Sequence, residues 1–530
     1  MPPRAPARLT TPRRSSSLAA ALVLAACGAA DDASTAGEAT SAADASSTGS
    51  VATADVTHPT TDASASSGAG TTDMATSTGA TSTGAGDTST GAPGTSTGDA
   101  PADAWVLRFG APDDQRPSGL GFDAQGAVWV AGDFFGALDL GGGPLAGAGT
   151  GVYLGKFAPD GSPLHSQALF PADGEAKLTN VTDLAVDGAG AVVVTGWLEG
   201  AYTIGGEPLV ADELDFYVGK WDADGAPLWG RRFGQSDWQV SEALTVGADD
   251  TIWIAGASLA PFAVGDIELT GTASTGMFVV RLDPDGAPLS GTWWGDAGDQ
   301  EIRGISRCDD GSVAISGFFN DVLTFGADTI EPVGDKDMFV ASLDPDGQPA
   351  WIRAFGGPGT DHAPLVRCTD AVAFAGVVTG PAQFGELALD PAGDADVVLA
   401  RLDDDGALTW AAGVTGPDDQ LPTGLVAGPD GALMLALTAA GATQFGALDH
   451  ASAGATDLLL ATYADAAASP TQIVSLGDRD VQRSGPLALG PDGAAALAGT
   501  IAGTVAWPGL APVTAEGPAD LVLVRFTPQP

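Results

Sequence analysis

Short apolar runs alternate with Asp/Gly turns from residue 104 to residue 530, and this alternation repeats seven times. In most copies a turn precedes a β-type run that ends in a small residue and Gly, as in Asp123–Gly126 followed by Val128–Gly132. Successive turns end 64, 60, 61, 59, 61 and 62 residues apart, at Gly126, Gly190, Asp250, Gly311, Asp370, Gly431 and Gly493. A fixed period of this length is typical of a repeat architecture.

Two further markers keep the same phase in each copy. One is a bulky residue followed by Gly, as in Phe325-Gly326, and the other is an apolar run that leads into an Asp-Gly turn, as in Phe339 to Gly347. A fourth run is rich in aromatic residues, as in Trp351 to Gly356. Because two-residue Asp-Gly loops favour hairpins, each copy is predicted to form a four-stranded antiparallel unit from three period-2 runs and one aromatic run.

Seven such units predict an all-β fold, a seven-bladed β-propeller of four-stranded antiparallel blades. The seventh copy stops after its third run, at Phe526, whereas an extra aromatic strand, Trp105 to Gly110, precedes the first copy. We therefore expect the N-terminal strand to complete the last blade as its outer strand. An open solenoid would need capping repeats to protect its edges, and the sequence contains none.

The combined pattern resembles the SBBP-type β-propeller repeat of bacterial proteins. The best matches are Asp337 to Gly347 with Trp351 to Gly356, and Asp215 to Val218 with Trp229 to Gly234. The resemblance covers roughly residues 104–530, although aromatic residues give way to Ala, Val and Leu in copies five to seven. It implies a scaffold of secreted and surface proteins and no established activity.

Residues 1–26 are predicted to be a lipoprotein signal peptide. A basic segment without acids leads into an apolar run that is too short to cross a bilayer, and Leu24-Ala25-Ala26-Cys27 resembles the bacterial lipobox. The resemblance implies lipidation of Cys27. Lipoproteins that stay in the inner membrane usually carry Asp directly after this cysteine, so Gly28 favours the outer membrane, where the protein would face the periplasm or the cell surface. Export by the Sec route is favoured, because Ser15–Ser17 lack the bulky apolar residue of a twin-arginine signal. The alternative is an ordinary secretory signal that contains a cysteine.

Residues 27–103 are predicted to be a disordered stalk. From residue 28 to residue 103 there is no Lys, Arg, Trp, Phe, Tyr, Leu or Ile, and ten carboxylates repel one another. Such a composition cannot bury enough apolar surface to offset the entropy of ordering. The stalk is either O-glycosylated or a plain spacer.

The charge of the chain excludes several classes of partner. The sequence has 67 acidic and 21 basic residues and a formal net charge of -46, which argues against nucleic acid and against polybasic docking on anionic lipid. Residues 104–530 carry 57 of the acids and 17 of the bases. The expected partners are the membrane, through the N-terminal lipid, and an unknown protein or glycan; the protein is expected to be a monomer.

One polar position recurs about eleven residues ahead of the turn end and is the candidate binding rim. If the second run of each unit is innermost, these residues ring one mouth of the central channel. The members are Gln115, Gln239, Gln300, Gln420 and Gln482, with His362 in the matching place of copy five and Asp114, Asp237, Asp299, Asp361 and Asp419 beside them. The alternative is that they satisfy backbone groups between blades, since a residue repeated in nearly every blade is usually part of the scaffold.

Cys308 and Cys368 form a candidate disulfide. They occupy equivalent places in adjacent copies four and five, and an oxidising compartment permits a bond. Equivalent strands diverge, however, and a disulfide needs Cα atoms within about 7 Å of each other. The alternative is a pair of small buried residues inherited by duplication.

No dedicated metal or cofactor site is expected. Asp215, Asp337, Asp396, Asp457 and Asp520 each begin the third run of a copy and are interpreted as turn caps. Loops such as Asp283–Gly286 lack the further ligands of an EF-hand, so only weak calcium binding by the acidic surface is expected.

No catalytic residue is predicted, because the sequence holds no nucleophile elbow, phosphate loop or CxxC motif. The hypothesis is therefore a lipid-anchored, non-catalytic binding or scaffold module. One alternative is a secreted hydrolytic or carbohydrate-active propeller enzyme with a site at the channel mouth. Another is a passive acidic coat.

Overall fold

The computed structural model describes residues 104–528 apart from 111–113, 173–177, 273, 392, 394, 429, 466 and 468. These residues belong to one compact unit, which spans Ala92–Pro530. All of its regular elements are β-strands, and the described part of the chain holds no α-helix. Cys27 and the predicted signal peptide and stalk lie outside the described residues.

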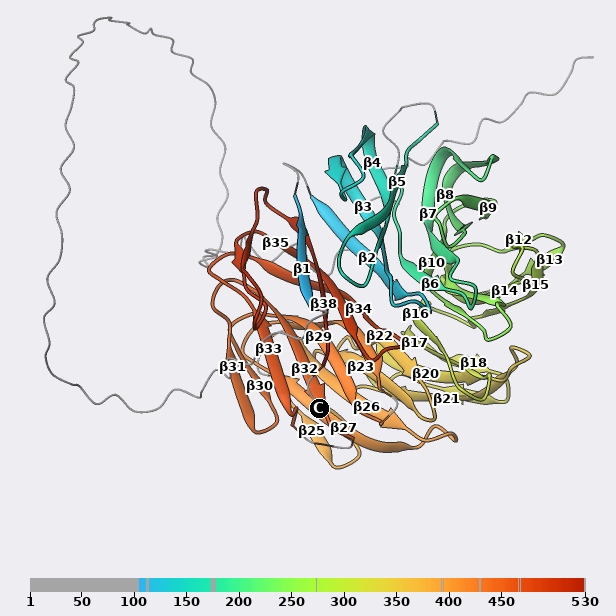
Figure 1. Cartoon of the computed structure of the whole chain (residues 1–530). Helices are drawn as coiled ribbons and strands as arrows, with labels where there is room; N and C mark the ends of the chain where they lie inside the picture. The colour runs from blue at the N-terminus through green and yellow to red at the C-terminus, as the bar shows by residue number, and fades with distance from the viewer. Residues whose placement is uncertain are drawn as a thin grey trace, which may run out of the picture. The chain divides into compact units, whose positions relative to one another are not determined.

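Seven antiparallel sheets follow one another around a closed ring and form the seven blades, which Figure 1 shows in chain order from blue to red. The innermost strands are β2 (Gln115–Phe122), β6 (Asp183–Val186), β10 (Gln239–Val246), β16 (Gln300–Arg307), β22 (His362–Cys368), β28 (Gln420–Ala427) and β34 (Gln482–Leu489). The second strands are β3 (Val128–Asp139), β7 (Val192–Ile204), β11 (Ile252–Ser258), β17 (Val313–Phe319), β23 (Val372–Val378), β29 (Leu433–Ala439) and β35 (Ala495–Ile501). The predicted all-β propeller is thereby confirmed.

The outer half of each blade consists of a third strand and an edge strand. The third strands are β4 (Pro144–Phe157), β8 (Glu207–Trp221), β14 (Gly276–Leu282), β20 (Asp337–Leu343), β26 (Asp396–Leu402), β32 (Asp457–Tyr463) and β38 (Asp520–Phe526). The edge strands are β5 (Pro163–Leu169), β9 (Pro227–Phe233), β15 (Pro288–Trp294), β21 (Pro349–Phe355), β27 (Leu408–Thr415), β33 (Gln472–Leu476) and β1 (Trp105–Phe109).

The ring closes through the N-terminal strand, as the sequence predicts. β1 pairs with β38 in antiparallel register from Trp105↔Arg525 to Phe109↔Leu521. Blade seven is therefore assembled from both ends of the described chain. Closure in this way covers the edge of β38, which would otherwise offer unpaired backbone groups to other chains.

The bulky residue followed by Gly is a hairpin turn and not a blade strand. In blade four, for example, Phe325-Gly326 joins β18 (Leu323–Phe325) to β19 (Asp328–Ile330), which form a small separate sheet. The corresponding short hairpins are β12 (Phe262–Val264) with β13 (Ile267–Leu269), β24 (Ala382–Phe384) with β25 (Leu387–Leu389), β30 (Ala442–Phe445) with β31 (Leu448–Ala451), and β36 (Thr504–Val505) with β37 (Val513–Thr514). Of these, β30 also pairs with β27, so the hairpin of blade six extends the sheet of blade five. The blade strand that the markers missed is the innermost one, because it is bulged and its polar residues break the period-2 pattern.

The hydrophobic core lies between blades, in seven clusters that each join two neighbours around the ring. The second strands are covered on both faces, and every residue of β11 is buried. This explains why these strands are nearly continuous apolar runs. The Gly that ends such a run is required by a close approach: a Cβ at Gly256 would lie 2.0 Å from the carbonyl oxygen of Val240 on the inner strand.

The aromatic run and the Asp-Gly turn form a contact between neighbouring blades. The indole of Trp351 on β21 donates a hydrogen bond to the carbonyl of Asp404 in the turn of blade five, at 2.8 Å. Gly406 of that turn has φ +76, and a Cβ there would lie 2.7 Å from the indole. Trp105 on β1 donates in the same way to Pro159 of blade one, at 2.9 Å, so the contact is also made where the ring closes.

Candidate functional site

The five repeated glutamines begin the innermost strands, but none of them lines an open rim. Gln115, Gln239, Gln300, Gln420 and Gln482 are all fully buried. Their place at the start of the strands follows the predicted phase, whereas the side chains turn into the protein and away from the channel. The rim interpretation is therefore wrong for the glutamines. The alternative, that they satisfy backbone groups, agrees with the contacts of Gln239, Gln300 and Gln482, whereas neither polar side-chain atom of Gln420 has a hydrogen-bond partner among the described residues.

Each glutamine whose contacts are resolved folds back on the loop that leads in from the preceding blade. Gln239 accepts the N–H of Gln235 at 3.1 Å and donates to the carbonyl of Ser236 at 2.9 Å. Gln482 accepts the N–H of Asp478 at 3.1 Å and donates to its carboxylate at 2.7 Å. A buried amide supplies both a donor and an acceptor, which is what a buried irregular loop needs.

In blade five it is Asp361, and not His362, that occupies the glutamine place. Asp361 is fully buried, and its carboxylate accepts the N–H of Gly357, four residues earlier, as Gln239 and Gln482 do. Its own N–H donates to the carbonyl of Lys336 at 2.7 Å. The assignment of His362 to this position is off by one residue, because the turn after β22 is shorter than those of the other blades.

His362 is instead held in a cationic neighbourhood. Burial, together with the positive charges of Arg303 and Lys336, lowers the pKa of His362 to about 4. Lys336 places its ammonium 3.7 Å from the centre of the Phe318 ring, and burial lowers its pKa. His362 is thus neutral at physiological pH.

The aspartates beside the glutamines mostly act through their backbone. The carbonyls of Asp114, Asp299 and Asp419 accept N–H groups from the ends of the second strands, Phe135 at 3.1 Å, Asn320 at 3.2 Å and Ala440 at 3.1 Å. Asp114 is exposed and Asp299 is half-buried, with Ser274 donating to its carboxylate at 3.0 Å. Asp237 is exposed, with φ 59.

The aspartates of the turns and third strands also bind backbone. Asp283 accepts the N–H groups of Asp285 and Ala287 at 3.0 and 2.7 Å, both on its Oδ1 atom, and so caps its turn. Four aspartates begin third strands, whereas Asp215 lies within β8, and all five are buried: Asp215, Asp337, Asp396, Asp457 and Asp520. Among the described residues, no group of three or more His, Cys, Asp or Glu side chains is arranged to hold a metal ion.

The channel is lined by residues three to seven positions further along the same inner strands. A β-bulge interrupts most of these strands at one place, for instance between Ser241 and Ala243 and between Ile302 and Gly304. A bulge re-aims the extra side chain. The bulged residues Ser118, Glu242, Arg303 and Thr423 all line the central cavity.

Small residues follow the bulges because neighbouring inner strands converge at the axis. A Cβ at Gly119 would lie 2.4 Å from the Cβ of Leu184 in the next blade, and one at Gly424 would lie 2.6 Å from that of Leu487. The convergence leaves a cavity of about 490 Å³, to which all seven inner strands contribute. This volume is in the range of small-molecule sites.

The wall of the cavity is charged on one side only. Blades two to five contribute Asp183, Glu242, Arg303 and Arg367, one from each blade, and we call these four residues the charged arc. The lining residues of blades six, seven and one carry no charge: Thr423, Gly424, Val426, Ala427, Pro486, Leu487, Ala488, Leu489, Ser118, Leu120, Gly121 and Phe122. The site therefore departs from the seven-fold symmetry of its scaffold.

The two carboxyl groups of the charged arc have pKa values that are raised toward neutral pH. Burial raises the pKa of Asp183 to about 6, although the N–H groups of Leu244 and Leu184 donate to it at 2.9 and 2.8 Å. Burial likewise raises the pKa of Glu242 to about 6, with Arg303 opposing the shift. Arg303 lies 3.5 Å from Glu242 and 2.6 Å from Glu301.

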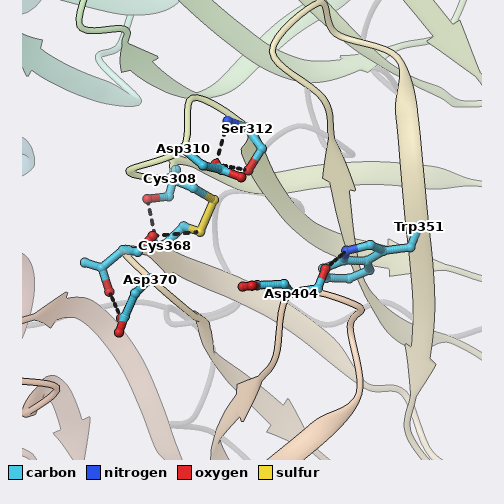
Figure 2. The surroundings of a disulfide bond; sticks show 9 residues. Cys308, Asp310, Ser312, Trp351, Cys368, Asp370 and Asp404 are labelled. Atoms are coloured by element: carbon cyan, nitrogen blue, oxygen red, sulfur yellow. Dashed lines mark hydrogen bonds between the residues drawn. A yellow bond between two sulfur atoms is a disulfide. The ribbon is translucent and has the colours of Figure 1, made fainter.

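Arg367 is held next to the disulfide that joins blades four and five. The structure bonds Cys308 to Cys368 with the Cα atoms 4.7 Å apart, and Figure 2 shows the bond between the turn of blade four and the end of β22. Cys368 is the last residue of β22, whereas Cys308 is the first residue after β16. The two cysteines are thus offset by one place and not equivalent, and this offset, together with the convergence of the inner strands, brings them within reach.

One cluster holds the residue types of a hydrolase without their arrangement. Ser475 and Asp457 both approach the Nε2 atom of His450, each at 3.4 Å, and Ser475 also donates to Asp457 at 3.2 Å. In a catalytic triad the carboxylate and the hydroxyl contact opposite ring nitrogens. The geometry of this cluster therefore does not activate Ser475.

The sequence contains a signal for the channel that is not a recurring residue. The bulged residue lies three positions after Gln115, Gln239, Gln300 and Gln420 and precedes Gly or Ala. Its identity changes from copy to copy, so a search for recurring residues cannot find it. A search for variation at a fixed phase would have found it.

No family model and no curated protein sequence matches the chain. Among solved structures, the chain is similar to the Pan2 WD40 domain of Neurospora crassa, with 11% identity over 78% of this chain and 92% of that chain and a TM-score of 0.40. It is also similar to an inactive virginiamycin B lyase from Staphylococcus aureus with quinupristin, with 11% identity, 79% and 99% coverage and a TM-score of 0.36. It is similar as well to YCF48 bound to D1 peptide, with 10% identity over 81% of this chain and 98% of that chain and a TM-score of 0.36. These similarities identify no family. Within the described residues, no helix is long and apolar enough to span a membrane.

Proposed function

We propose that the protein is a binding module that takes a ligand into the central channel of its propeller. The observation that carries the proposal is the charged arc: four ionisable residues from four blades line one cavity, and no other blade repeats them. Residues that only build the scaffold recur from blade to blade, as the buried glutamines do. Placing charges in a cavity is costly unless they are compensated, and a bound ligand supplies that compensation.

The module is displayed, in this proposal, as an SBBP-type lipoprotein on the outer membrane. Lipid on Cys27 and the stalk of residues 27–103 would tether the propeller, with export by the Sec route. This part of the proposal rests on the sequence alone. Acyl chains contribute about 0.8 kcal/mol per buried CH₂, so a diacylated and N-acylated cysteine would anchor the chain durably.

A ligand screen of the full chain tests the binding function. Glycans, small metabolites and surface proteins would be tested for a rise in Tm, with and without calcium. We expect at least one class to raise the Tm of the wild type and to lose this effect when Glu242→Gln and Arg303→Gln are combined. The proposal is overturned if no class binds, or if all binding survives the double substitution in a folded protein.

The anchoring is tested separately by incorporation of labelled palmitate. Wild-type cells are expected to label the protein and to retain it in the outer-membrane fraction. Cys27→Ser should abolish both the label and the retention. Retention of the Cys27→Ser protein in the outer membrane would contradict the lipid anchor and leave the channel proposal intact.

A hydrolytic enzyme is the second candidate. The observation that favours it is the pair Asp183 and Glu242, two carboxyl groups on neighbouring blades with pKa values raised to about 6. Groups of this kind serve as general acid and base near neutral pH. Turnover of a ligand found in the screen, with a loss of about 100-fold or more in Glu242→Gln, would establish the enzyme; binding without turnover would exclude it for that ligand.

A further inference from the structure

The charged arc contains an arginine whose guanidinium is not hydrogen-bonded to a carboxylate. Arg367 donates a hydrogen bond to the carbonyl of its neighbour Val366 at 3.1 Å, and no carboxylate of the described chain forms an ion pair with it. Asp183 acts on Arg367 through electrostatic attraction, but it does not supply hydrogen bonds to the guanidinium. An anionic group from outside would supply these hydrogen bonds in the cavity wall.

We propose that the central channel binds a small zwitterion, with its carboxylate on Arg367 and its ammonium on Asp183. The inference rests on the binding function proposed above and names the class of ligand. A guanidinium forms paired hydrogen bonds with a carboxylate, which fixes the orientation of the ligand as well as its charge.

Arg367 is rigidly presented to the cavity. The next residue, Cys368, is bonded to Cys308 of blade four, and its N–H donates to the hydroxyl of Ser306 at 3.0 Å. Arg367 therefore stands on backbone that is fixed to the neighbouring blade on one side. A preorganised guanidinium loses less conformational entropy on binding than a mobile one.

Asp183 supplies the negative charge for the ammonium group of the ligand. It lines the same cavity from blade two, and its carboxylate and Arg367 influence each other's pKa, so the two groups lie within electrostatic range. Burial raises the pKa of Asp183 and lowers that of Arg367, although the N–H groups of Leu244 and Leu184 and the attraction between the two charges oppose these shifts. The compensation in the free protein is therefore incomplete. A ligand ammonium beside Asp183 would stabilise the ionised carboxylate.

The overall charge of the propeller selects a zwitterion over a simple anion. An anion would have to approach a domain with 40 more acids than bases, whereas a zwitterion carries no net charge and meets no long-range repulsion. A simple cation would leave Arg367 without a partner. The remaining wall of the cavity is uncharged and includes the half-buried Phe122 and Leu489, so an aliphatic body is accommodated.

A set of six-carbon probes separates these possibilities. Norleucine and 6-aminohexanoate are zwitterions with adjacent and distant charges, hexanoate is only an anion, and hexylamine is only a cation. Binding to the full chain would be measured by calorimetry at pH 7.5. We expect one of the zwitterions to bind with a Kd at least tenfold lower than hexanoate and hexylamine.

Two substitutions should remove the two poles independently. Arg367→Gln should weaken the zwitterion at least tenfold, to the level of hexylamine, and Asp183→Asn should weaken it to the level of hexanoate. Arg367→Lys keeps the charge and should retain part of the affinity. Arg479→Gln and Asp212→Asn make the same changes at exposed residues outside the channel and should leave the Kd unchanged.

The inference is overturned if hexanoate binds as tightly as both zwitterions, if neither zwitterion binds, or if Arg367→Gln and Arg367→Lys bind like the wild type while remaining folded by circular dichroism. A ligand of another class from the screen, lost on Glu242→Gln with Arg303→Gln, would in those cases keep the binding function and remove only the zwitterion. Failure of both the probe set and the screen would remove both.

Discussion

Two sets of polar residues lie on the same seven inner strands and have opposite roles. The glutamines at the start of the strands recur in five blades and are fully buried against their own loops. The residues of the charged arc lie three to six positions further on, differ from blade to blade and face a cavity. Recurrence therefore marks what every blade needs to fold, and variation at the same phase marks what the assembled ring presents.

The largest effect on stability is expected from the disulfide. Its two cysteines do not recur from blade to blade, but they have a structural role, so they test how far recurrence marks structure. Replacing Cys308 and Cys368 together by Ser should lower the free energy of unfolding by about 4 kcal/mol, because the bond closes a loop of 60 residues in the unfolded chain. Chemical denaturation of wild type and variant in the oxidised form would measure this. A difference that persists after both proteins are treated with a reductant would have a cause other than the bond.

The next effect is expected at a repeated glutamine. Gln239→Leu should destabilise the fold by about 2 kcal/mol, because the N–H of Gln235 and the carbonyl of Ser236 lose their partners. Thermal denaturation measures the change. Gln235→Ala, at an exposed position of the same loop, is the matched control and should change the stability by about 0.5 kcal/mol or less. Equal effects of the two substitutions would contradict a buried role for the repeated amide.

The charged arc should instead show itself in the pH dependence of stability. The pKa values of Asp183 and Glu242 are raised in the folded protein, so the folded state holds their protons more tightly than the unfolded state. The contribution of these two groups to the free energy of unfolding is fully present below about pH 4 and is lost as the pH rises through 6. The charges of Arg367 near Asp183 and of Arg303 near Glu242 oppose these shifts, whereas the charge of Glu301 adds to the shift of Glu242.

Asp183→Asn combined with Glu242→Gln should therefore flatten the fall in Tm between pH 4 and pH 7. We expect a gain of roughly 1 °C relative to wild type at pH 7, corresponding to about 1 kcal/mol, and no gain at pH 4. Differential scanning calorimetry at the two pH values is the measurement. A gain of the same size at both values would point to packing and not to titration.

The smallest effect is expected on the uncharged side of the channel. Ser118 occupies the bulge position that Glu242 holds in blade three, but no charge depends on it. Ser118→Ala should change the free energy of unfolding by about 0.5 kcal/mol or less. A large loss would show that the bulge position is structural in every blade, and the contrast between the two sets would fail.

The period of the sequence was sufficient to predict the architecture. The seven copies, the four strands per blade and the closure of blade seven by Trp105–Phe109 all follow from spacing, because each blade is one local unit that must bury its faces against two neighbours. The order of strands within a blade did not follow from spacing. The Phe-Gly marker is a hairpin outside the blade, and the inner strand escaped notice because its bulge interrupts the alternation.

The residues of the candidate site could not be predicted from the sequence period. Asp183, Glu242, Arg303 and Arg367 are 59 to 64 residues apart in sequence, and nothing local distinguishes them from the many other charged residues. They meet only because inner strands from all seven blades converge on one axis. The same convergence places the Cys308 and Cys368 Cα atoms 4.7 Å apart, where the divergence expected of equivalent strands would have kept them separate.

By itself, then, the sequence determined the repeat, the fold class, the acidic character and the closing strand, since these follow from local propensity and from a period that is visible in one dimension. The tertiary structure alone decided which polar residues are buried and which face the channel. That distinction depends on the direction of each side chain at a bulge and on the approach of strands from different blades, and neither is encoded in the spacing of residues along the chain.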